Sequence, residues 1–280
     1  MKLVSFLDAN RIRTGVVDGE RVIDLSDAIA ALALPPERVA MLARRGVETP
    51  ASGMLRLLHA GPQAMRELAA HAASRRGNGT PLNELTLLAP VPRPGKIVAV
   101  GRNYADHAKE TGVDSFEKPR IISKLPSSVV GHGAEVRRPA AVTKMDFEAE
   151  LAVVIGGYAS GVPRDRALAC VAGYTVLNDL SAREFQFDVS PPQTTFAKSM
   201  DAFCPMGPWL VTADEIPDPQ ALELSCDVNG ERMQHGRTAD MIFPVDRLIE
   251  YVSQYMTLEP GDIIATGTPA GVGAFRKPPV

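Results

Sequence analysis

The pattern of apolar and polar residues along the 280-residue chain changes near residue 95. The first part opens with short alternating stretches that predict strands and continues with apolar residues at helical spacing. The strands are predicted at residues 2–7, 13–17 and 20–24, with Asp18-Gly19 as the turn between the last two, and the helices within residues 27–75, broken at Pro35-Pro36, Pro50 and Gly61-Pro62. A proline-rich connector follows at residues 90–94, so we place a small α/β N-terminal domain at residues 1–92.

The second part, residues 93–280, has the pattern of a mixed domain that is rich in strands. Strands are predicted at residues 96–100, 120–124, 150–155, 173–178, 208–212, 222–228 and 262–266. Asn229-Gly230 predicts a hairpin turn after the strand at 222–228, and one amphipathic helix is predicted at residues 244–256. The predicted fold class is therefore α+β, mostly β.

Two glutamates give the first indication of chemistry. Glu148 and Glu150 lie one residue apart, so on a strand their side chains share one face. The residues that follow, Leu151 to Ile155, are apolar on both faces, which is typical of a buried strand. Two carboxylates at the mouth of such a strand would repel each other and resist the loss of water. A bound hard cation would remove both costs.

Asp179 supplies a third carboxylate, because it ends the predicted strand at residues 173–178. Three carboxylates without a nearby histidine favour Mg²⁺ or Mn²⁺, which prefer oxygen ligands. The alternative interpretation places Glu148 and Glu150 on a solvated edge strand and Asp179 in an ordinary turn. The apolar run after Glu150 argues against that alternative, since edge strands usually carry scattered charges.

A histidine and a glutamate form the second candidate group. A short helix is predicted directly after the strand at 96–100, and Gly112 closes it. His107 and Glu110 are three residues apart and therefore share one face of that helix. A carboxylate fixes the tautomer of a histidine and raises its basicity, as a general base near neutral pH requires. The alternative is a chance pair on an exposed helix.

Basic residues form the third group. Arg183 follows Asp179 by four residues, and Lys198 lies further along the chain; either could bind a substrate carboxylate or a developing oxyanion. Lys124, at the end of an apolar strand, could do the same or pair with an acidic side chain. Each of the three could equally be an ordinary surface residue. Residues 266–273 are rich in glycine, which lets backbone amides approach an anion.

Composition narrows the class of protein. The net charge of −3 gives no reason to expect binding to nucleic acid. No apolar run is long enough to span a bilayer, and the N-terminus lacks the apolar core of a signal peptide. The three cysteines, Cys170, Cys204 and Cys226, do not have the spacing of a disulfide framework or a zinc site, so we expect a cytoplasmic location.

Taken together, these stretches resemble the fumarylacetoacetate hydrolase (FAH) family. The resembling stretches are Gly101-x-Asn103-Tyr104-Ala105-x-His107-x-x-Glu110, Lys124-x-x-Ser127-Ser128-Val129-Val130-Gly131, Asp146-Phe147-Glu148-Ala149-Glu150-Leu151-Ala152, Gly173-Tyr174-Thr175-Val176-x-Asn178-Asp179-x-Ser181-Ala182-Arg183, Lys198-Ser199-x-Asp201, Gly207-Pro208-Trp209 and Gly267-Thr268-Pro269-Ala270-Gly271-Val272-Gly273. Each stretch alone is weak, but their order and combination from Lys96 to Gly273 are highly specific. The N-terminal segment is similar to the small accessory domain of the family's bacterial members.

The resemblance implies a mixed β-roll catalytic domain, assembled as a homodimer. It implies His107 as the base with Glu110 as its partner, and Lys198 as a further catalytic residue. The implied Mg²⁺ or Mn²⁺ ligands are Glu148, Glu150 and Asp179, and the implied substrate-binding residues are Asn103, Tyr104, Lys124, Arg183, Gln186 and Thr268. Family members normally continue past a segment like residues 276–280 with further closing strands, so we expect C-terminal strands to be missing from this sequence.

The resemblance also implies a class of reaction, since family members cleave, decarboxylate or isomerise small keto acids. The main hypothesis is a metal-dependent hydrolase that cleaves a C–C bond in an acylpyruvate-like 2,4-diketo acid, in aromatic or sugar-acid catabolism. The first alternative is a decarboxylase or keto–enol isomerase of a related keto acid, such as oxaloacetate or a ring-cleavage dicarboxylate. The second is a non-catalytic homologue that only binds metal.

Overall fold

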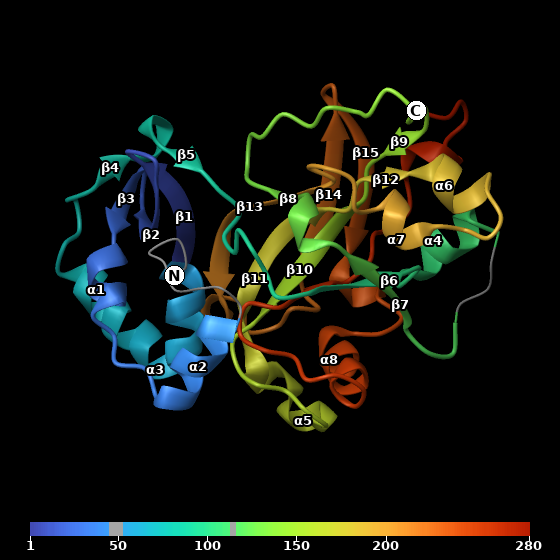
Figure 1. Ribbon diagram of the computed structural model, residues 1–280. Coiled ribbons are helices and arrows are strands. Elements are labelled where there is room, and N and C mark those ends of the chain that lie inside the picture. The colour runs from blue at the N-terminus through green and yellow to red at the C-terminus, as the bar shows by residue number, and fades with distance from the viewer. Residues whose placement is uncertain (45–52, 113–115) are drawn as a thin grey trace.

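A large mixed sheet organises the computed structural model, which describes residues 1–44, 53–112 and 116–280 (Figure 1). The predicted break at Pro50 lies outside the described residues. Twelve strands form the sheet in the order β4-β3-β2-β1-β13-β11-β10-β16-β6-β7, with β5 beside β1 and β8 beside β13. Their bounds are β1 Lys2–Asp8, β2 Arg11–Asp18, β3 Arg21–Asp24, β4 Thr80–Pro81, β5 Thr86–Leu87, β6 Ile97–Gly101, β7 Arg120–Lys124, β8 Val129–Val130, β10 Ala149–Ile155, β11 Val171–Asn178, β13 Cys204–Thr212 and β16 Ile263–Ala265.

The remaining strands form two small pairs, β9 (Met145–Asp146) with β12 (Ser181–Ala182), and β14 (Glu223–Val228) with β15 (Glu231–Arg237). The helices are α1 Ser26–Ala30, α2 Pro36–Arg44, α3 Gly53–Ala73, α4 Ala105–Glu110, α5 Arg164–Ala167, α6 Arg183–Phe187, α7 Thr194–Ala197 and α8 Val245–Ser253. None of these helices is long and apolar enough to cross a membrane. The sheet-dominated α+β class predicted from the sequence is confirmed.

The N-terminal strands and α1 to α3 lie at one end of the molecule, drawn in blue and teal in Figure 1. The sheet is nevertheless continuous, because β1 pairs with β13 through Lys2 opposite Val211 and Leu3 opposite Leu210. Helix α3 carries the predicted interruption, since Gly61 has a φ of 86° inside it. The domain boundary between residues 92 and 93 stays a prediction.

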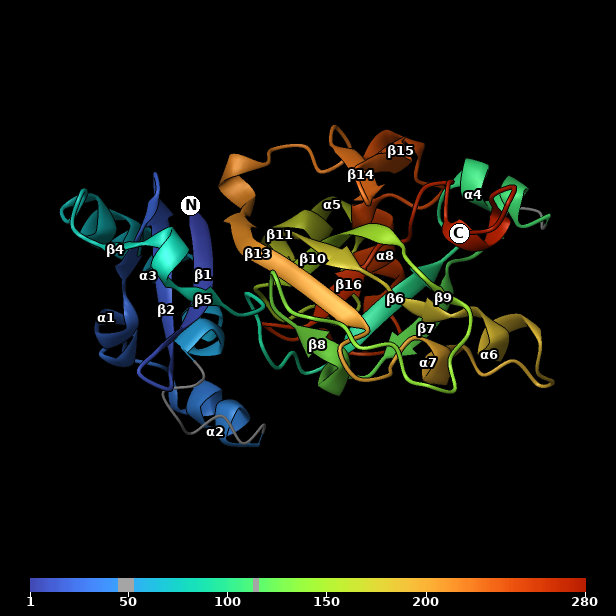
Figure 2. The ribbon, with the colours of Figure 1, turned by 90° about the horizontal axis from the view of Figure 1, so that it is seen from above.

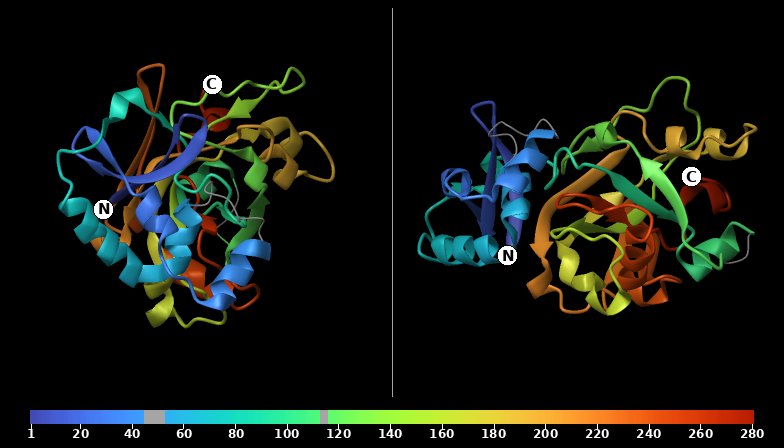
Figure 3. Two further views of the ribbon diagram at one scale, coloured as in Figure 1. Left: turned by 60° about the vertical axis from the view of Figure 1, so that its left-hand side comes forward. Right: turned by 60° about the horizontal axis from the view of Figure 1, so that its bottom comes forward.

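Strand β10 is buried along its whole length because its two faces contribute to two different cores. Leu151, Val153 and Ile155 pack in a cluster that also contains apolar residues of α8, which lies beside α5 on one face of the sheet (Figure 3). Ala152 and Val154 belong to the opposite cluster, which includes apolar residues of α3. The continuous apolar run after Glu150 therefore reflects burial on both faces, as the sequence predicted.

Most predicted elements are present within a few residues of their predicted bounds. Helix α4 is closed by Gly112 with a φ of 70°, and Asn229 and Gly230 form the β14–β15 turn with φ values of 54° and 82°. The early hairpin turn lies one residue later than predicted, because Asp18 pairs with Arg21. Strand β13 begins four residues earlier than predicted, since its first residues pair in parallel with β8.

The end of the sheet away from the N-terminal strands carries α4, α6 and α7 together with the C-terminal segment, as two perpendicular views agree (Figures 1 and 2). The loops that follow β6, β11 and β16 lead into this region. Three separate stretches of the chain are thereby brought to one place. The candidate chemistry lies there.

Because β10 is buried on both faces, shortening one of its apolar side chains should destabilise the fold. We expect Ile155→Ala to lower the free energy of unfolding by about 2–5 kcal/mol, because Ile155 is 0% exposed and its removal leaves a cavity. Val176→Ala on neighbouring β11 is the control, since Val176 is 52% exposed and its change should stay within about 0.5 kcal/mol. Urea unfolding monitored by the Trp209 fluorescence measures both. Equal losses would contradict the two-core arrangement.

Candidate active site

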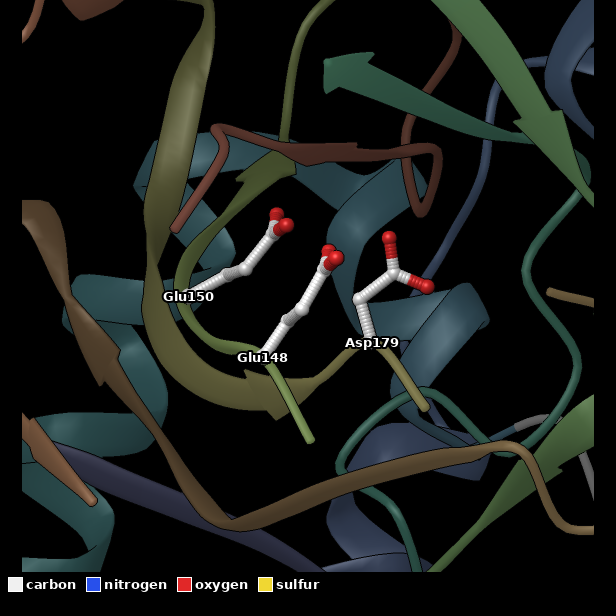
Figure 4. A group of neighbouring side chains, drawn as sticks. All are labelled: Glu148, Glu150 and Asp179. Carbon is white, nitrogen blue, oxygen red and sulfur yellow. The ribbon is translucent and has the colours of Figure 1, made fainter. Parts of the chain in front are cut away.

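Glu148, Glu150 and Asp179 converge at the ends of two neighbouring strands. Glu148 immediately precedes β10, Glu150 is the second residue of β10, and Asp179 immediately follows β11. The backbone N–H of Asp179 donates to the carbonyl of Glu148 at 2.8 Å, which holds the two stretches side by side. One carboxylate oxygen from each residue lies within 4.8 Å of the others. Figure 4 shows the three side chains pointing the same way from these strand ends.

Glu150 carries the largest electrostatic cost in this group. Its carboxylate is 1% exposed and accepts a 2.9 Å hydrogen bond from the Gly267 N–H. Burial first, and then the charges of Asp179 and Glu148, raise the pKa of Glu150 well above its ordinary value. No basic side chain among the described residues forms an ion pair with it.

Three cationic side chains contact the other carboxylates. Lys198 Nζ donates to Glu148 Oε2 at 2.8 Å and to Asp179 Oδ2 at 2.7 Å, and Lys124 Nζ lies 2.6 Å from Asp179 Oδ1. Arg183 lies 2.7 Å from Glu148 Oε1. Although burial alone would raise it, the charges of Lys198 and Arg183 hold the pKa of Glu148 well below its ordinary value.

This arrangement fits a hard divalent cation. The three carboxylates offer only oxygen ligands and lie in one buried cluster, and in the described part of the chain Glu150 forms no ion pair. Such a donor set suits Mg²⁺ or Mn²⁺ better than a softer metal. A cation between the carboxylates would offset the repulsion that raises the pKa of Glu150.

His107 and Glu110 form the pair that the helical spacing predicted. His107 Nδ1 lies 2.6 Å from Glu110 Oε1, and Glu110 Oε2 accepts a 3.1 Å bond from the Gly271 N–H. A carboxylate only accepts hydrogen bonds, so Nδ1 carries the proton in the neutral ring and Nε2 is free to accept one. The ring is 6% exposed and packs edge-on against Phe275. The geometry is that of an oriented general base.

Asp146 organises the site, and the sequence reasoning gave it no role. Its Oδ1 accepts from Gly273 N at 2.7 Å, and its Oδ2 accepts from Ala274 N at 3.0 Å and from Arg183 Nε at 2.8 Å. Arg183 Nη1 also donates to Gln186 Oε1 at 2.9 Å. Asp146 therefore ties the loop after β16 to Arg183. The Asp-x-Glu-x-Glu spacing was the available signal, since a third acid on the same face adds to the same cluster.

The glycine-rich stretch after β16 does approach anions, as predicted, but the anions are the protein's own carboxylates. Gly267 binds Glu150, Gly271 binds Glu110 and Gly273 binds Asp146. Gly267, with a φ of 97°, leaves no room for a side chain, because a Cβ there would lie 2.8 Å from the Asn103 Cβ. This loop thus positions three acidic side chains at once.

A cavity of about 230 Å³ opens over these groups. The predicted site residues that line it are His107, Glu148, Glu150, Asp179, Arg183, Gln186, Lys198 and Thr268. Phe187 at the end of α6, Pro192 in the loop that follows, Thr194 at the start of α7 and Phe275 in the C-terminal segment add to the walls. The cavity therefore joins the candidate base, the acidic triad and an apolar wall in one space.

The structure places three of the predicted substrate contacts outside the cavity lining. Asn103 is fully buried and bonds the backbone of Phe243 and Thr266. Tyr104 is 0% exposed in the apolar core, where burial raises the pKa of its phenol. Lys124 is 0% exposed and is engaged by Asp179 and by backbone carbonyls, so its predicted alternative role as an ion-pair partner is the one the structure supports.

Two arginines in the cavity wall were missed. Arg102 and Arg120 both line the cavity beside Gly101 and Ile122. Arg102 occupies an unspecified position inside a resembling stretch, and Arg120 begins a strand that was read only for its apolar residues. Only the pairing of β6 with β7 brings them together, with Arg120 opposite Gly101. No local pattern carries that information.

The site's composition agrees with comparisons to known proteins. Residues 96–280 match the family model for the C-terminal domain of fumarylacetoacetate (FAA) hydrolase. The chain belongs to this family. Its relatives include enzymes that are named for different reactions. Membership in the family therefore does not decide which reaction this chain catalyses.

Two relatives and one solved structure show the range. The chain is 50% identical over 200 residues to mitochondrial oxaloacetate tautomerase FAHD2A of Homo sapiens, covering 71% of this chain and 64% of that protein. It is 37% identical to mitochondrial oxaloacetate tautomerase fahd2 of Xenopus laevis, covering 100% of this chain and 83% of that protein. The crystal structure of maleylpyruvate hydrolase from Sphingobium sp. SYK-6, in complex with manganese(II) and pyruvate, matches with a TM-score of 0.77 and 31% identity, covering 98% of this chain and 90% of that one. The match therefore spans under two thirds of the length of the human relative.

Glu150 gives the sharpest test of the metal site. We expect Glu150→Gln to weaken Mn²⁺ binding by at least about 100-fold. Loss of a residue that only supports a metal ligand costs up to about 100-fold in affinity, and loss of a ligand itself should cost at least as much. Glu223→Gln is the matched control, because Glu223 is an exposed residue of β14 that does not line the cavity. Isothermal titration with Mn²⁺ measures both variants. Unchanged affinity in Glu150→Gln would remove this residue from the ligand set.

Proposed function

We propose that this chain is a Mg²⁺- or Mn²⁺-dependent keto–enol tautomerase of an oxaloacetate-like 2-keto acid. The observation that carries the proposal is that one oriented base, His107, and the acidic triad line the same cavity. Tautomerisation needs no attacking water and no leaving group, so these two elements suffice. The tautomerase relatives support the proposal, and they favour it over the C–C bond hydrolysis that the sequence analysis placed first.

The triad and the base divide the work between them. A divalent cation held by Glu148, Glu150 and Asp179 would supply Lewis-acid polarisation of the substrate's 2-keto and carboxylate oxygens. His107 Nε2 takes a proton from the carbon next to the keto group, and the C–H electron pair becomes the C=C bond of the enolate. The imidazolium then returns a proton to the former keto oxygen, which gives the enol. The reverse sequence converts enol to keto.

The partner groups hold the base and the triad in place. Glu110 stabilises the imidazolium that forms, and Gly271 holds Glu110. Lys198 donates to Glu148, Asp179 and Ser181, all of them protein groups. We therefore assign Lys198 to positioning the carboxylates and balancing their charge, in place of direct proton transfer. Arg183 has the same kind of role toward Asp146 and Glu148.

Hydrolysis of an acylpyruvate-like diketo acid is the second candidate. The specific observation in its favour is the likeness over nearly the whole chain to the maleylpyruvate hydrolase that was crystallised with manganese(II) and pyruvate. In that reaction His107 would deprotonate a water that attacks the distal carbonyl. Decarboxylation would need no such water. The same cavity could accommodate each of these reactions, so they are distinguished by identifying the products.

The reaction class is tested by following products directly. With enol-oxaloacetate and Mn²⁺, we expect rapid loss of the enol absorbance without release of CO₂, and we expect acetylpyruvate to be cleaved far more slowly. Removing the metal with EDTA should abolish the activity, and added Mn²⁺ should restore it. Stoichiometric CO₂ or acetate would replace the proposal by decarboxylation or hydrolysis. Metal binding with no turnover of any of these acids would favour the non-catalytic homologue.

His107 carries the proton in this scheme. We expect His107→Asn to lower kcat by about 10²–10⁴-fold, the usual contribution of a general base. Mn²⁺ affinity should be unchanged, because His107 is no part of the proposed ligand set. His235 is an exposed residue of β15 that does not line the cavity, so His235→Asn serves as the control and should retain full kcat. A His107→Asn enzyme with unaltered kcat would eliminate this base from the mechanism.

Two further expectations from the sequence remain predictions. The implied homodimer stays a prediction, and light scattering would measure the molar mass of the assembly. The cytoplasmic location also stays untested, and the relatives from Homo sapiens and Xenopus laevis are named mitochondrial.

A further inference from the structure

We propose that Arg102 and Arg120 form a second carboxylate site in the cavity wall, which selects 2-keto acids that carry a distal carboxylate. The inference rests on the proposed function and narrows its substrate class. Both arginines line the cavity that contains the triad and His107. A substrate chelated at one end could therefore reach them with its other end.

The two arginines are the basic residues of the cavity that the protein leaves uncompensated. Neither side chain forms an ion pair or a hydrogen bond with any residue in the described parts of the chain. Arg183 and Lys198, by contrast, are engaged by protein carboxylates. Burial, and then the neighbouring charge of Arg120, lower the pKa of Arg102. Two half-buried like charges are a cost that an anionic ligand would offset.

Backbone conformation and strand pairing determine where the two arginine side chains start. Arg102 has a φ of 57°, a left-handed conformation that is rare for a residue with a side chain and costs about 1 kcal/mol or more. Arg120 lies opposite Gly101, and a Cβ on that glycine would lie 3.5 Å from the Arg120 Cδ. The guanidinium carbon of Arg102 lies 5.8 Å from the centre of the Phe116 ring. The left-handed backbone and the Phe116 ring constrain the Arg102 side chain, and within the described residues no carboxylate pairs with either arginine.

A carboxylate is the ligand that this pair recognises best. Guanidinium groups present planar forks of N–H donors that match a carboxylate in two parallel bonds. The same lining includes the apolar residues Val100, Ile122 and Phe187, which suit the short carbon chain of a diacid. A 2-keto monocarboxylate would satisfy the triad and leave the arginine pair unpaired. The pair therefore discriminates between the two classes.

The test compares two ligands that differ only in the distal charge, oxaloacetate and its 4-methyl ester. We expect Arg102→Gln and Arg120→Gln each to lower kcat/KM for oxaloacetate by about 10–100-fold, the range for losing a hydrogen bond to a charged group. The loss should fall mainly in KM, and kcat/KM for the ester should change less than about threefold. Arg137→Gln, at an exposed position away from the cavity, is the control and should alter neither value.

Binding separates this proposal from the proposed function. Titration of both ligands into Mn²⁺-loaded His107→Asn protein measures recognition without turnover. We expect the diacid to bind about 10–100-fold tighter than the ester, and this preference to disappear when Arg102→Gln is added. A preference that persists, or an equal loss for both ligands, overturns the arginine site. If the unmodified protein binds the diacid tightly but does not tautomerise it, the proposed function is overturned and the arginine site stands.

Discussion

Repulsion among carboxylates in a dry cleft is the constraint on which this site depends. Asp146, Glu148, Glu150 and Asp179 are all nearly inaccessible to water, and three cationic side chains contact three of them. One negative charge is left over at Glu150, where the pKa is raised well above its ordinary value. A divalent cation would convert that surplus into a positive site that attracts an anionic substrate. The same balance of charges therefore affects both the stability of the fold and the binding of a ligand.

The fold makes this cluster possible by bringing strand ends together. Strands β10 and β11 pair in an antiparallel register that places Glu148 beside Asp179. The loop after β16 then supplies backbone amides to Glu150, Glu110 and Asp146. Because these donors belong to the backbone, they hold the acids without adding side chains to the cavity. Glu150, Glu110 and Asp146 are therefore tied to one loop, while part of the cavity wall comes from α6, the loop that follows it and the C-terminal segment.

The sequence predicted the parts of the site that depend on local spacing. Glu148 and Glu150 share a strand face at spacing two, and His107 and Glu110 share a helix face at spacing three. Local spacing carries no such information where the position of a side chain depends on tertiary packing. Asn103 and Tyr104 lie within a resembling stretch, yet one bridges two loops and the other fills the core.

Residues joined by sheet pairing escaped prediction for a related reason. Arg102 and Arg120 become neighbours through the β6–β7 register, and a single sequence does not specify which strands pair. The continuous sheet through β1 and β13 was hidden in the same way. Patterns of apolar residues predicted that strands exist at these places. The partners of those strands required the structure.

The central claim is that Glu148, Glu150 and Asp179 hold one divalent ion inside the cavity. Anomalous diffraction at the manganese edge, from crystals soaked with Mn²⁺ and oxalate, tests it most directly. The account predicts one strong peak within coordination distance of an oxygen from each of the three residues, with oxalate completing its ligands. A peak elsewhere, or none between these carboxylates, would contradict the account.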